Sequence, residues 1–163
     1  MTNPTLYLET SVIGYLTSRP SRDVITAGNQ QITYEWWDEH RERFEIFISE
    51  AVVAECSAGD PSAAAERLAR IGDIPVLVVS DAVEALAENL IRGVPLPDKA
   101  AVDALHIAVA AINGMDFLMT WNCVHIANAA LLDSIESIIE AEGLKCPTIC
   151  TPQQLMEPEN DVA

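Results

Sequence analysis

Three acidic side chains lie in stretches of this sequence that contain no Lys or Arg to neutralise them. Glu9 directly follows an apolar run, whereas Glu55 and Asp103 lie within the segments AVVAEC and AAVDALHIAVAAI. No Lys or Arg occurs in residues 44–66 or 100–144. A carboxylate in apolar surroundings costs several kcal/mol unless it is paired, protonated or bound to a metal. If these acids converge, their mutual repulsion favours a divalent cation between them.

Asn122 is a fourth candidate ligand, because it places an uncharged oxygen just after another apolar run. Oxygen ligands of this kind favour Mg²⁺ or Mn²⁺ over Zn²⁺. Taken singly, each residue also has an ordinary structural explanation. Glu9 can be an exposed strand end, and Glu55 can face solvent on an amphipathic helix. The joint pattern is what indicates a metal site.

Alternating strand and helix patterns explain how residues far apart in the sequence can meet. Apolar runs rich in β-formers predict strands at residues 5–9, 44–49, 74–80, 116–120 and 147–151. Helical periodicity predicts helices at residues 10–16, 22–42, 50–57, 62–72, 81–93, 96–114 and 123–143. Strands separated by helices indicate an α/β fold with three α/β/α layers around a mainly parallel sheet of four to five strands.

The carboxyl ends of parallel strands are where ligand sites form in such sheets, and Glu9 and Asn122 are expected there. The first helix is expected to be capped by Thr10 or Ser11. The run at 74–80 is apolar throughout, which predicts a strand buried on both faces.

Length and composition restrict the class of protein. With 163 residues, half of them hydrophobic, we expect one folded domain at residues 1–155 and a flexible tail at 156–163. No membrane-spanning run or export signal is apparent, and four scattered cysteines suit reduced thiols, so we expect a cytoplasmic protein. A net charge of −16 argues against a nucleic-acid coat protein. It does not exclude an enzyme that bridges phosphates with metal ions.

Three segments in this order resemble the PIN domain, and specifically the VapC-like toxin family: YLETSVIGYL, ISEAVVAEC and DALHIAVAAINGMDFLMTWN. The TWN motif resembles that of a bacterial subgroup. The resemblance implies a PIN-like fold and a metal-dependent endoribonuclease that hydrolyses RNA phosphodiester bonds. It also implies the toxin component of a type II toxin–antitoxin pair, with a small antitoxin protein as partner and a homodimeric state.

The resemblance also implies roles for individual residues. The expected catalytic residues are Glu9, Glu55, Asp103 and Asn122. The three carboxylates would hold one or two Mg²⁺ or Mn²⁺ ions, with the amide helping directly or through water. The hydroxyls of Thr10 and Thr120 would position a phosphate or a water molecule. Candidate contacts to the RNA backbone are Arg19, Arg22, Arg41 and Arg43, although these can equally form a solvated helix face.

Two departures from the family pattern keep a second function open. The first acid of the family is usually Asp, whereas this chain has Glu9, and the fourth is often Asp, whereas this chain has Asn122. The site would then carry three carboxylates in place of four, and a second cation would bind less tightly. The alternative is a PIN-fold module that binds protein or nucleic acid with weak or no nuclease activity.

Other signals have more than one interpretation. His106, one turn after Asp103, can be a general base, but a histidine that supports a ligand or fills the core is the commoner case. Trp36 and Trp37 can stack on bases, or pack one ring into the core and present the other at an interface. Cysteine and histidine spacing near residues 123–125 and 146–150 fits no strong zinc motif.

Overall fold

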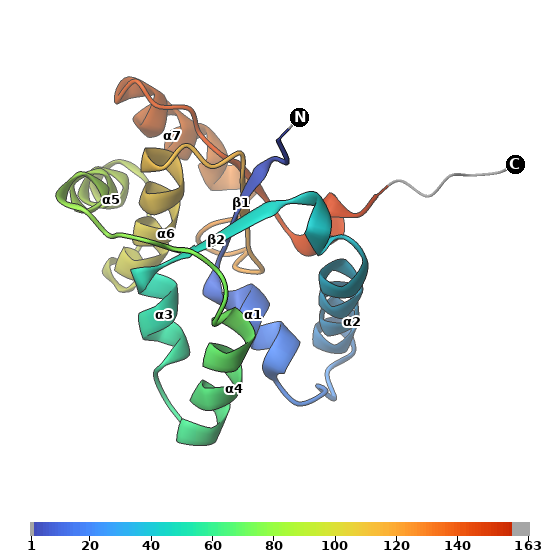
Figure 1. The fold of residues 1–163 in the computed structure, drawn as a ribbon. Helices are drawn as coiled ribbons and strands as arrows, with labels where there is room; N and C mark the ends of the chain where they lie inside the picture. Colours follow the sequence, from blue (N-terminus) through green and yellow to red (C-terminus); the bar gives the residue numbers. More distant parts are fainter. Residues whose placement is uncertain (1, 158–163) are drawn as a thin grey trace, which may run out of the picture.

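Short apolar runs of the sequence form a parallel sheet of five strands in the computed structural model, which describes residues 2–157 (Figure 1). The strands are β1 (Thr5–Leu8), β2 (Glu45–Ser49), β3 (Val76–Leu77), β4 (Phe117–Met119) and β5 (Thr148–Cys150). Their order is β3-β2-β1-β4-β5, and all four pairings are parallel. The central β1 pairs on both sides, and its residues Leu6, Tyr7 and Leu8 are fully buried.

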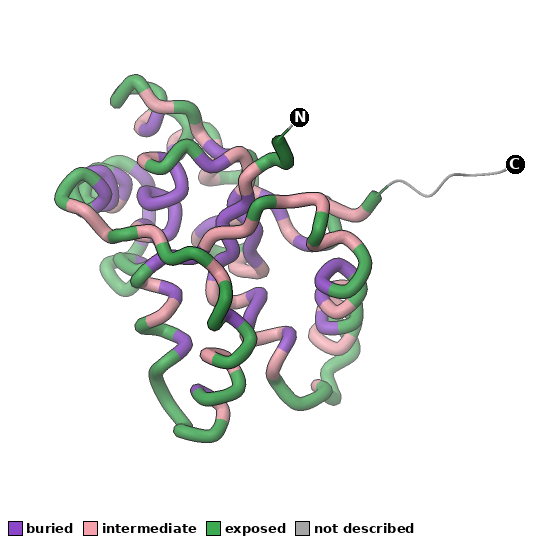
Figure 2. Tube along the Cα trace, viewed as in Figure 1, coloured by how far each residue is buried: buried purple, intermediate pink, exposed green. Residues whose placement is uncertain are grey.

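Seven α-helices connect and cover these strands in the described part of the chain. They are α1 (Thr10–Thr17), α2 (Val24–Glu39), α3 (Glu50–Cys56), α4 (Pro61–Ile71), α5 (Asp81–Gly93), α6 (Ala101–Ile112) and α7 (Ala129–Ala141). Helix α5 packs against α6 and α7, whereas α1 packs against α2 and α4 (Figure 1). The faces of α5 and α6 that point into the protein are buried, as is β1 (Figure 2). The expected α/β fold with a parallel sheet of up to five strands is therefore confirmed.

The strand predicted at 74–80 differs from the structure. Only Val76 and Leu77 pair, and they pair only with β2, so β3 is an edge strand. Val76 is 47% exposed and Val78 is 64% exposed, so the expectation of burial on both faces is wrong. The two valines lie on the same side of the strand, because side chains alternate along it. That side lies open to solvent, which the apolar sequence alone does not reveal.

Three predicted helices are shorter than expected. The helix predicted at 22–42 begins at Val24, where Asp23 caps it, and it ends at Glu39. The helix predicted at 96–114 begins with a 3₁₀ turn at Asp98–Ala100 and continues as α6. The helix predicted at 123–143 begins only at Ala129. Asn128 caps it there, and the side-chain oxygen of Asn122 accepts hydrogen bonds from two backbone N–H groups that hold the preceding residues in a turn.

Both tryptophans of α2 belong to the core. Trp36 is fully buried against Phe44, with 5.8 Å between ring centroids, and Trp37 is 6% exposed. Neither ring is therefore free to stack on a base or to fill an interface, as considered from the sequence. Among residues 2–157, no helix combines the length and the apolar character needed to cross a membrane. The tail predicted to be flexible lies, from residue 158 onward, outside the described residues.

Asp116 fixes the register between β1 and β4. Its Oδ2 accepts hydrogen bonds from the Thr5 backbone N–H at 2.9 Å and from the Thr5 hydroxyl at 3.2 Å. We predict that Asp116→Ala lowers the free energy of unfolding by about 1–3 kcal/mol, because it leaves partly buried donors without an acceptor. Urea denaturation measures this change. Asp133→Ala, on the exposed surface of α7, is the control, and equal losses in the two variants would contradict the assignment.

Candidate functional site

Glu9 occupies the point where β1 ends and α1 begins, at the carboxyl edge of the sheet. Its Oε2 accepts a hydrogen bond from the Ser11 backbone N–H at 2.8 Å, so Glu9 itself caps α1. The expectation that Thr10 or Ser11 caps this helix is therefore wrong. A glutamate replaces the usual short side chain, since its longer stem folds back onto the first turn.

Two hydroxyl groups complete the surroundings of this carboxylate. Ser11 Oγ donates to Glu9 Oε1 at 2.6 Å, and Thr120 Oγ1 donates to the same oxygen at 2.5 Å. Glu9 is only 5% exposed. A buried carboxylate is costly, and three donors together with the start of a helix offset that cost without any basic residue. The group is thus held in one orientation while acceptor capacity remains on its oxygens.

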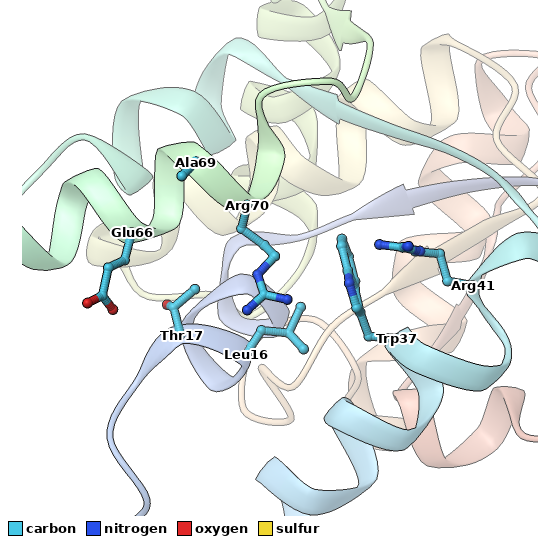
Figure 3. A pocket seen from close by; sticks show the side chains of 7 residues that line it. All are labelled: Leu16, Thr17, Trp37, Arg41, Glu66, Ala69 and Arg70. Atoms are coloured by element: carbon cyan, nitrogen blue, oxygen red, sulfur yellow. The ribbon is translucent and has the colours of Figure 1, made fainter.

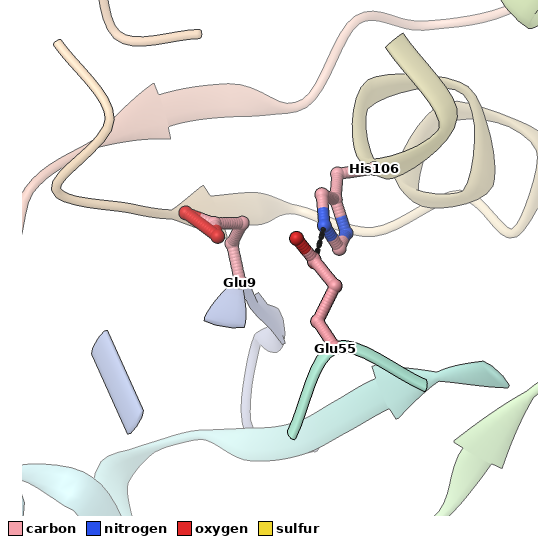
Figure 4. Close-up of side chains that lie close together, drawn as sticks. All are labelled: Glu9, Glu55 and His106. Carbon is pink, nitrogen blue, oxygen red and sulfur yellow. Dashed lines mark hydrogen bonds and ion pairs between the residues drawn. The ribbon is translucent and has the colours of Figure 1, made fainter. Parts of the chain in front are cut away.

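Glu55, on α3, lies beside Glu9 in the folded chain (Figure 4). It also contacts Thr10, from which it is 45 positions away in the sequence. Its Oε1 accepts from Thr10 Oγ1 at 2.7 Å and from His106 Nε2 at 2.5 Å. Ligand atoms of Glu9, Glu55 and His106 all lie within 4.8 Å of one another. This is the spacing that one small cation can bridge.

Partial burial alone would raise the pKa of Glu55, but the hydrogen bonds from His106 and Thr10 outweigh it, so the pKa is lowered. Glu55 is therefore ionised at neutral pH and can only accept hydrogen bonds, which means that His106 Nε2 carries the proton between them.

Behind Glu55, a buried row of polar groups supports His106. Its Nδ1 lies 2.6 Å from the Tyr7 hydroxyl, which lies 2.7 Å from Ser49 Oγ. His106 and Ser49 are fully buried, and burial raises the pKa of Tyr7, so its hydroxyl stays protonated. If Ser49 donates to Tyr7 and Tyr7 donates to Nδ1, every group in the row is satisfied. His106 thus orients Glu55, in keeping with the supporting role considered from the sequence.

Asp103 and Asn122 lie at the other side of the site and are linked through His125. Asp103 Oδ2 is 2.8 Å from His125 Nδ1. Asn122 Oδ1 accepts from the backbone N–H groups of His125 at 3.0 Å and Val124 at 3.3 Å. These bonds hold the turn that replaces the start of the predicted helix. The amide oxygen of Asn122 therefore already serves the backbone.

One hydrogen-bonded network connects the four residues singled out from the sequence. The Asn122 backbone N–H donates to Thr120 Oγ1 at 2.9 Å, and that hydroxyl in turn donates to Glu9. Asp103 joins through His125, and Glu55 joins through Thr10, the residue after Glu9. The network joins all four, but the ligand atoms that lie within 4.8 Å of one another are those of Glu9, Glu55 and His106, and Asp103 is not in that group. The roles of the four as ligands stay a prediction.

The expected task of Thr10 and Thr120, positioning a phosphate or a metal-bound water, stays a prediction, and the structure shows a different contact for each hydroxyl. Both hydroxyls donate to site carboxylates, and Thr120 is fully buried, so it orients Glu9 from within the protein. Sequence reasoning missed Ser11 and His125 as members of the site. Their spacing, two residues after Glu9 and three after Asn122, is a signal only when the turns that follow these residues are known.

The donor set of the site fits a hard divalent cation. Among the described residues, the second oxygens of Glu55 and Asp103 accept no hydrogen bond, and neither side chain pairs with a Lys or Arg. Glu55 and Asp103 each keep a free oxygen, and Glu9 adds a third carboxylate whose two oxygens already accept hydrogen bonds. Carboxylate oxygens without a Lys or Arg partner match the preference of Mg²⁺ and Mn²⁺. His106 Nε2 is directed at Glu55, so the oxygens are the available ligands.

Thr120→Val tests how far the orientation of Glu9 depends on a hydroxyl. The change keeps the shape of the side chain but removes a donor to a buried carboxylate and an acceptor for Asn122. We predict a loss of about 2–3 kcal/mol in the free energy of unfolding, because bonds to charged groups are among the stronger ones. Thr148→Val, exposed on β5, is the matched control in the same urea titration. A loss no larger than that of the control would contradict the role of Thr120.

Glu55→Gln tests the direction of the pKa shift in metal-free protein. A carboxylate whose pKa is lower in the folded state stabilises the fold above its unfolded pKa, and this contribution disappears as the pH falls through the folded pKa. In EDTA we therefore predict that the stability difference between wild type and Glu55→Gln is greatest near pH 7 and shrinks towards pH 3. Urea titrations at several pH values measure this. Glu136→Gln, exposed on α7, makes the same chemical change away from the site and is measured beside it.

Comparison with known proteins places this arrangement in a structural context. Neither a scan against models of protein families nor a search of curated proteins finds a match for the sequence. Two solved structures are similar in fold. VapBC2 from Rickettsia felis, bound to a DNA fragment from their promoter, aligns with a TM-score of 0.56 and 13% identity, covering 90% of this chain and 98% of that chain.

The second similar structure is VapC20 from Mycobacterium tuberculosis, described as a toxin that cleaves the sarcin–ricin loop. It aligns with a TM-score of 0.55 and 17% identity, covering 86% of this chain and 96% of that chain. At this level of identity, the likeness concerns the fold. Both alignments extend over most of the residues from β1 to β5, as the sequence segments suggested. The chain therefore has the PIN-like fold of the VapC toxins.

Proposed function

We propose that this protein is a Mg²⁺- or Mn²⁺-dependent endoribonuclease and the toxin of a toxin–antitoxin pair. The observation that carries the proposal is that ligand atoms of Glu9 and Glu55 lie within 4.8 Å of each other at the carboxyl edge of a parallel sheet, with His106 beside them and no Lys or Arg partner. Asp103 is connected to the same edge through His125. The fold shared with VapC toxins supports RNA as the substrate class.

In such a reaction the carboxylates would hold the cation, and the neighbouring groups would orient the carboxylates. A bound divalent cation would supply an activated water and neutralise charge on the scissile phosphate. Glu9, Glu55 and Asp103 would hold it, and the surrounding hydroxyl and imidazole groups keep the first two carboxylates in fixed orientations. Because these donors are in place before substrate binds, little reorganisation is needed during the reaction.

The alternative function is a binding module with weak or no nuclease activity. It is favoured by Asn122, whose amide oxygen caps a turn, so the site offers three carboxylates and no fourth. The net charge of −16 also disfavours high-affinity binding of RNA. A cleavage assay separates the two functions, because only the nuclease depends on the carboxylates for turnover.

A gel assay of RNA cleavage tests the proposal. We predict that wild-type protein cleaves RNA with Mn²⁺, that EDTA abolishes cleavage, and that Glu55→Gln and Asp103→Asn each lower the rate on the order of 100-fold. Loss of a ligand removes several kcal/mol of charge stabilisation, which corresponds to a factor of this size. Glu136→Gln, exposed on α7, is the matched control and should retain the wild-type rate. Cleavage that persists equally in all variants would point to a contaminating nuclease or a different site.

Asn122→Asp tests whether residue 122 reaches the cation. From the sequence, Asn122 would replace a carboxylate, and the change would then tighten Mn²⁺ about tenfold. In the structure the side-chain oxygen binds two backbone N–H groups, a task that Asp performs equally well. We therefore predict a gain of less than about fivefold, the size expected of a partly exposed charge nearby. Isothermal titration with Mn²⁺ measures it, and tightening of tenfold or more would show that residue 122 is a ligand.

The expected partners follow from the same proposal. A small antitoxin would bind the toxin, and a homodimer remains a prediction for the free protein. Trp36 and Trp37 are buried and do not contribute to such an interface. If the segment of α2 takes part, its exposed apolar residues are Val24 and Ile25, at 84% and 75% exposure. The cytoplasmic location likewise stays a prediction.

A further inference from the structure

A pocket of about 510 Å³ lies between α1, α2 and α4, apart from the carboxylates (Figure 3). Its lining residues are Leu16, Thr17, Trp37, Arg41, Glu66, Ala69 and Arg70. Two of these are among the nine basic residues of a chain that has 25 acids. A hollow that gathers positive charge on such an acidic protein calls for an explanation.

The indole of Trp37 stands between two guanidinium groups (Figure 3). The Arg41 Cζ lies 4.5 Å from the ring centroid and the Arg70 Cζ lies 5.8 Å from it. Stacking on an aromatic ring holds each guanidinium in place while its N–H groups stay free. The buried tryptophan is therefore a support for two cations, and its ring is not available to a base.

Neither arginine is neutralised by a carboxylate of the described residues. The ion pairs found in residues 2–157 involve Arg43 and Arg92 but not Arg41 or Arg70. Glu66 also lines the pocket, but it makes no ion pair with Arg70, and its carboxylate lies away from the ring, beside Thr17 (Figure 3). Two free, oriented guanidinium groups form an anion-binding arrangement.

We propose that this pocket binds the phosphate backbone of single-stranded RNA beside the cleaved bond. The inference rests on the proposed nuclease function and adds a substrate subsite to it. Helix α1 connects the two places, since Glu9 caps its start and Leu16 and Thr17 at its end line the pocket. At 1.5 Å per residue, the pocket lies about 10 Å along the helix from the carboxylates. A strand held at Glu9 has only to follow α1 to reach the two arginines.

The spacing of the arginines favours a strand over a single small anion. Their Cζ atoms lie 4.5 Å and 5.8 Å from the same ring centroid and on opposite sides of the ring, so the indole stands between the two guanidinium groups (Figure 3). One phosphate ion cannot contact both guanidinium groups fully, whereas phosphates along a flexible strand can each take one. An acidic peptide offers similar charges. RNA is favoured because the proposed substrate, when bound at the carboxylate edge, already lies close to the pocket.

Binding of a fluorescein-labelled 12-nucleotide single-stranded RNA, measured by anisotropy in EDTA, tests the proposal. We expect Arg41→Gln/Arg70→Gln to weaken binding about tenfold. The slope of log K against log salt should fall by about 1.4, since each contacted phosphate of a single strand contributes about 0.7. Arg92→Gln/Lys145→Gln removes the same two positive charges at exposed positions that do not line the pocket, and it should stay within twofold of wild type. A gel of the recovered RNA verifies that it is intact.

A second variant guards against loss of folding. Arg41→Lys/Arg70→Lys keeps both charges but loses the planar stacking groups, so it should keep the wild-type salt slope and bind RNA more weakly than wild type. Thermal melts verify that each variant folds.

The outcomes separate the inference from the proposed function. If wild type cleaves RNA but the double Gln variant binds it as tightly as wild type, the subsite is wrong and the nuclease stands. If wild type neither binds nor cleaves RNA, both fail. If a glutamate 12-mer binds wild type as tightly as RNA does, and the double Gln variant loses it, the pocket serves an acidic peptide and the RNA subsite is overturned.

Discussion

The buried carboxylate of Glu9 is the constraint on which the rest of the site depends. A charge that is 5% exposed at the end of a central strand persists only where donors surround it. Here the donors come from the first turn of α1 and from the residue after β4, so the carboxylate joins two neighbouring strands. Its backbone N–H also bonds Met119, which continues the pairing of β1 and β4 by one residue.

The other acids of the site are also oriented by hydrogen-bond donors that are not Lys or Arg. Hydroxyl, imidazole and backbone groups orient the acids, and none of these groups carries the fixed positive charge of Lys or Arg. A lysine or arginine would satisfy an acid more strongly but would remove its attraction for a cation. The arrangement keeps Glu55 ionised and leaves free oxygens on Glu55 and Asp103. It therefore suits a site that gains its positive charge from solution.

Charge is distributed unevenly over this acidic chain. The carboxylates gather at the sheet edge, and two arginines flank Trp37 near the far end of α1. For a polyanionic substrate, the first region is repulsive until a cation binds, whereas the second is attractive throughout. Such a division would let metal control productive binding while the arginines hold the strand.

Much of the architecture could be predicted from the sequence, because strands and helices each leave a periodic pattern. The parallel sheet and the acids at its edge follow from apolar runs that end in Glu9 or precede Asn122 by two residues. Burial could not be predicted at β3, since an apolar run does not show which strand lies at the edge. The capping by Glu9 and its bond to Thr120, 111 residues away, depend on tertiary contacts that no local pattern encodes.

An anomalous difference map from crystals grown with Mn²⁺ tests most directly whether the acids share a cation. The account predicts a peak about 2.1 Å from carboxylate oxygens of Glu9 and Glu55, with Asp103 bound directly or through water. A peak only elsewhere would contradict it, for example at Glu35 and Glu39 of α2 with His40 just after the helix, whose ligand atoms also lie within 4.8 Å of one another. So would the absence of any peak at the sheet edge at millimolar Mn²⁺.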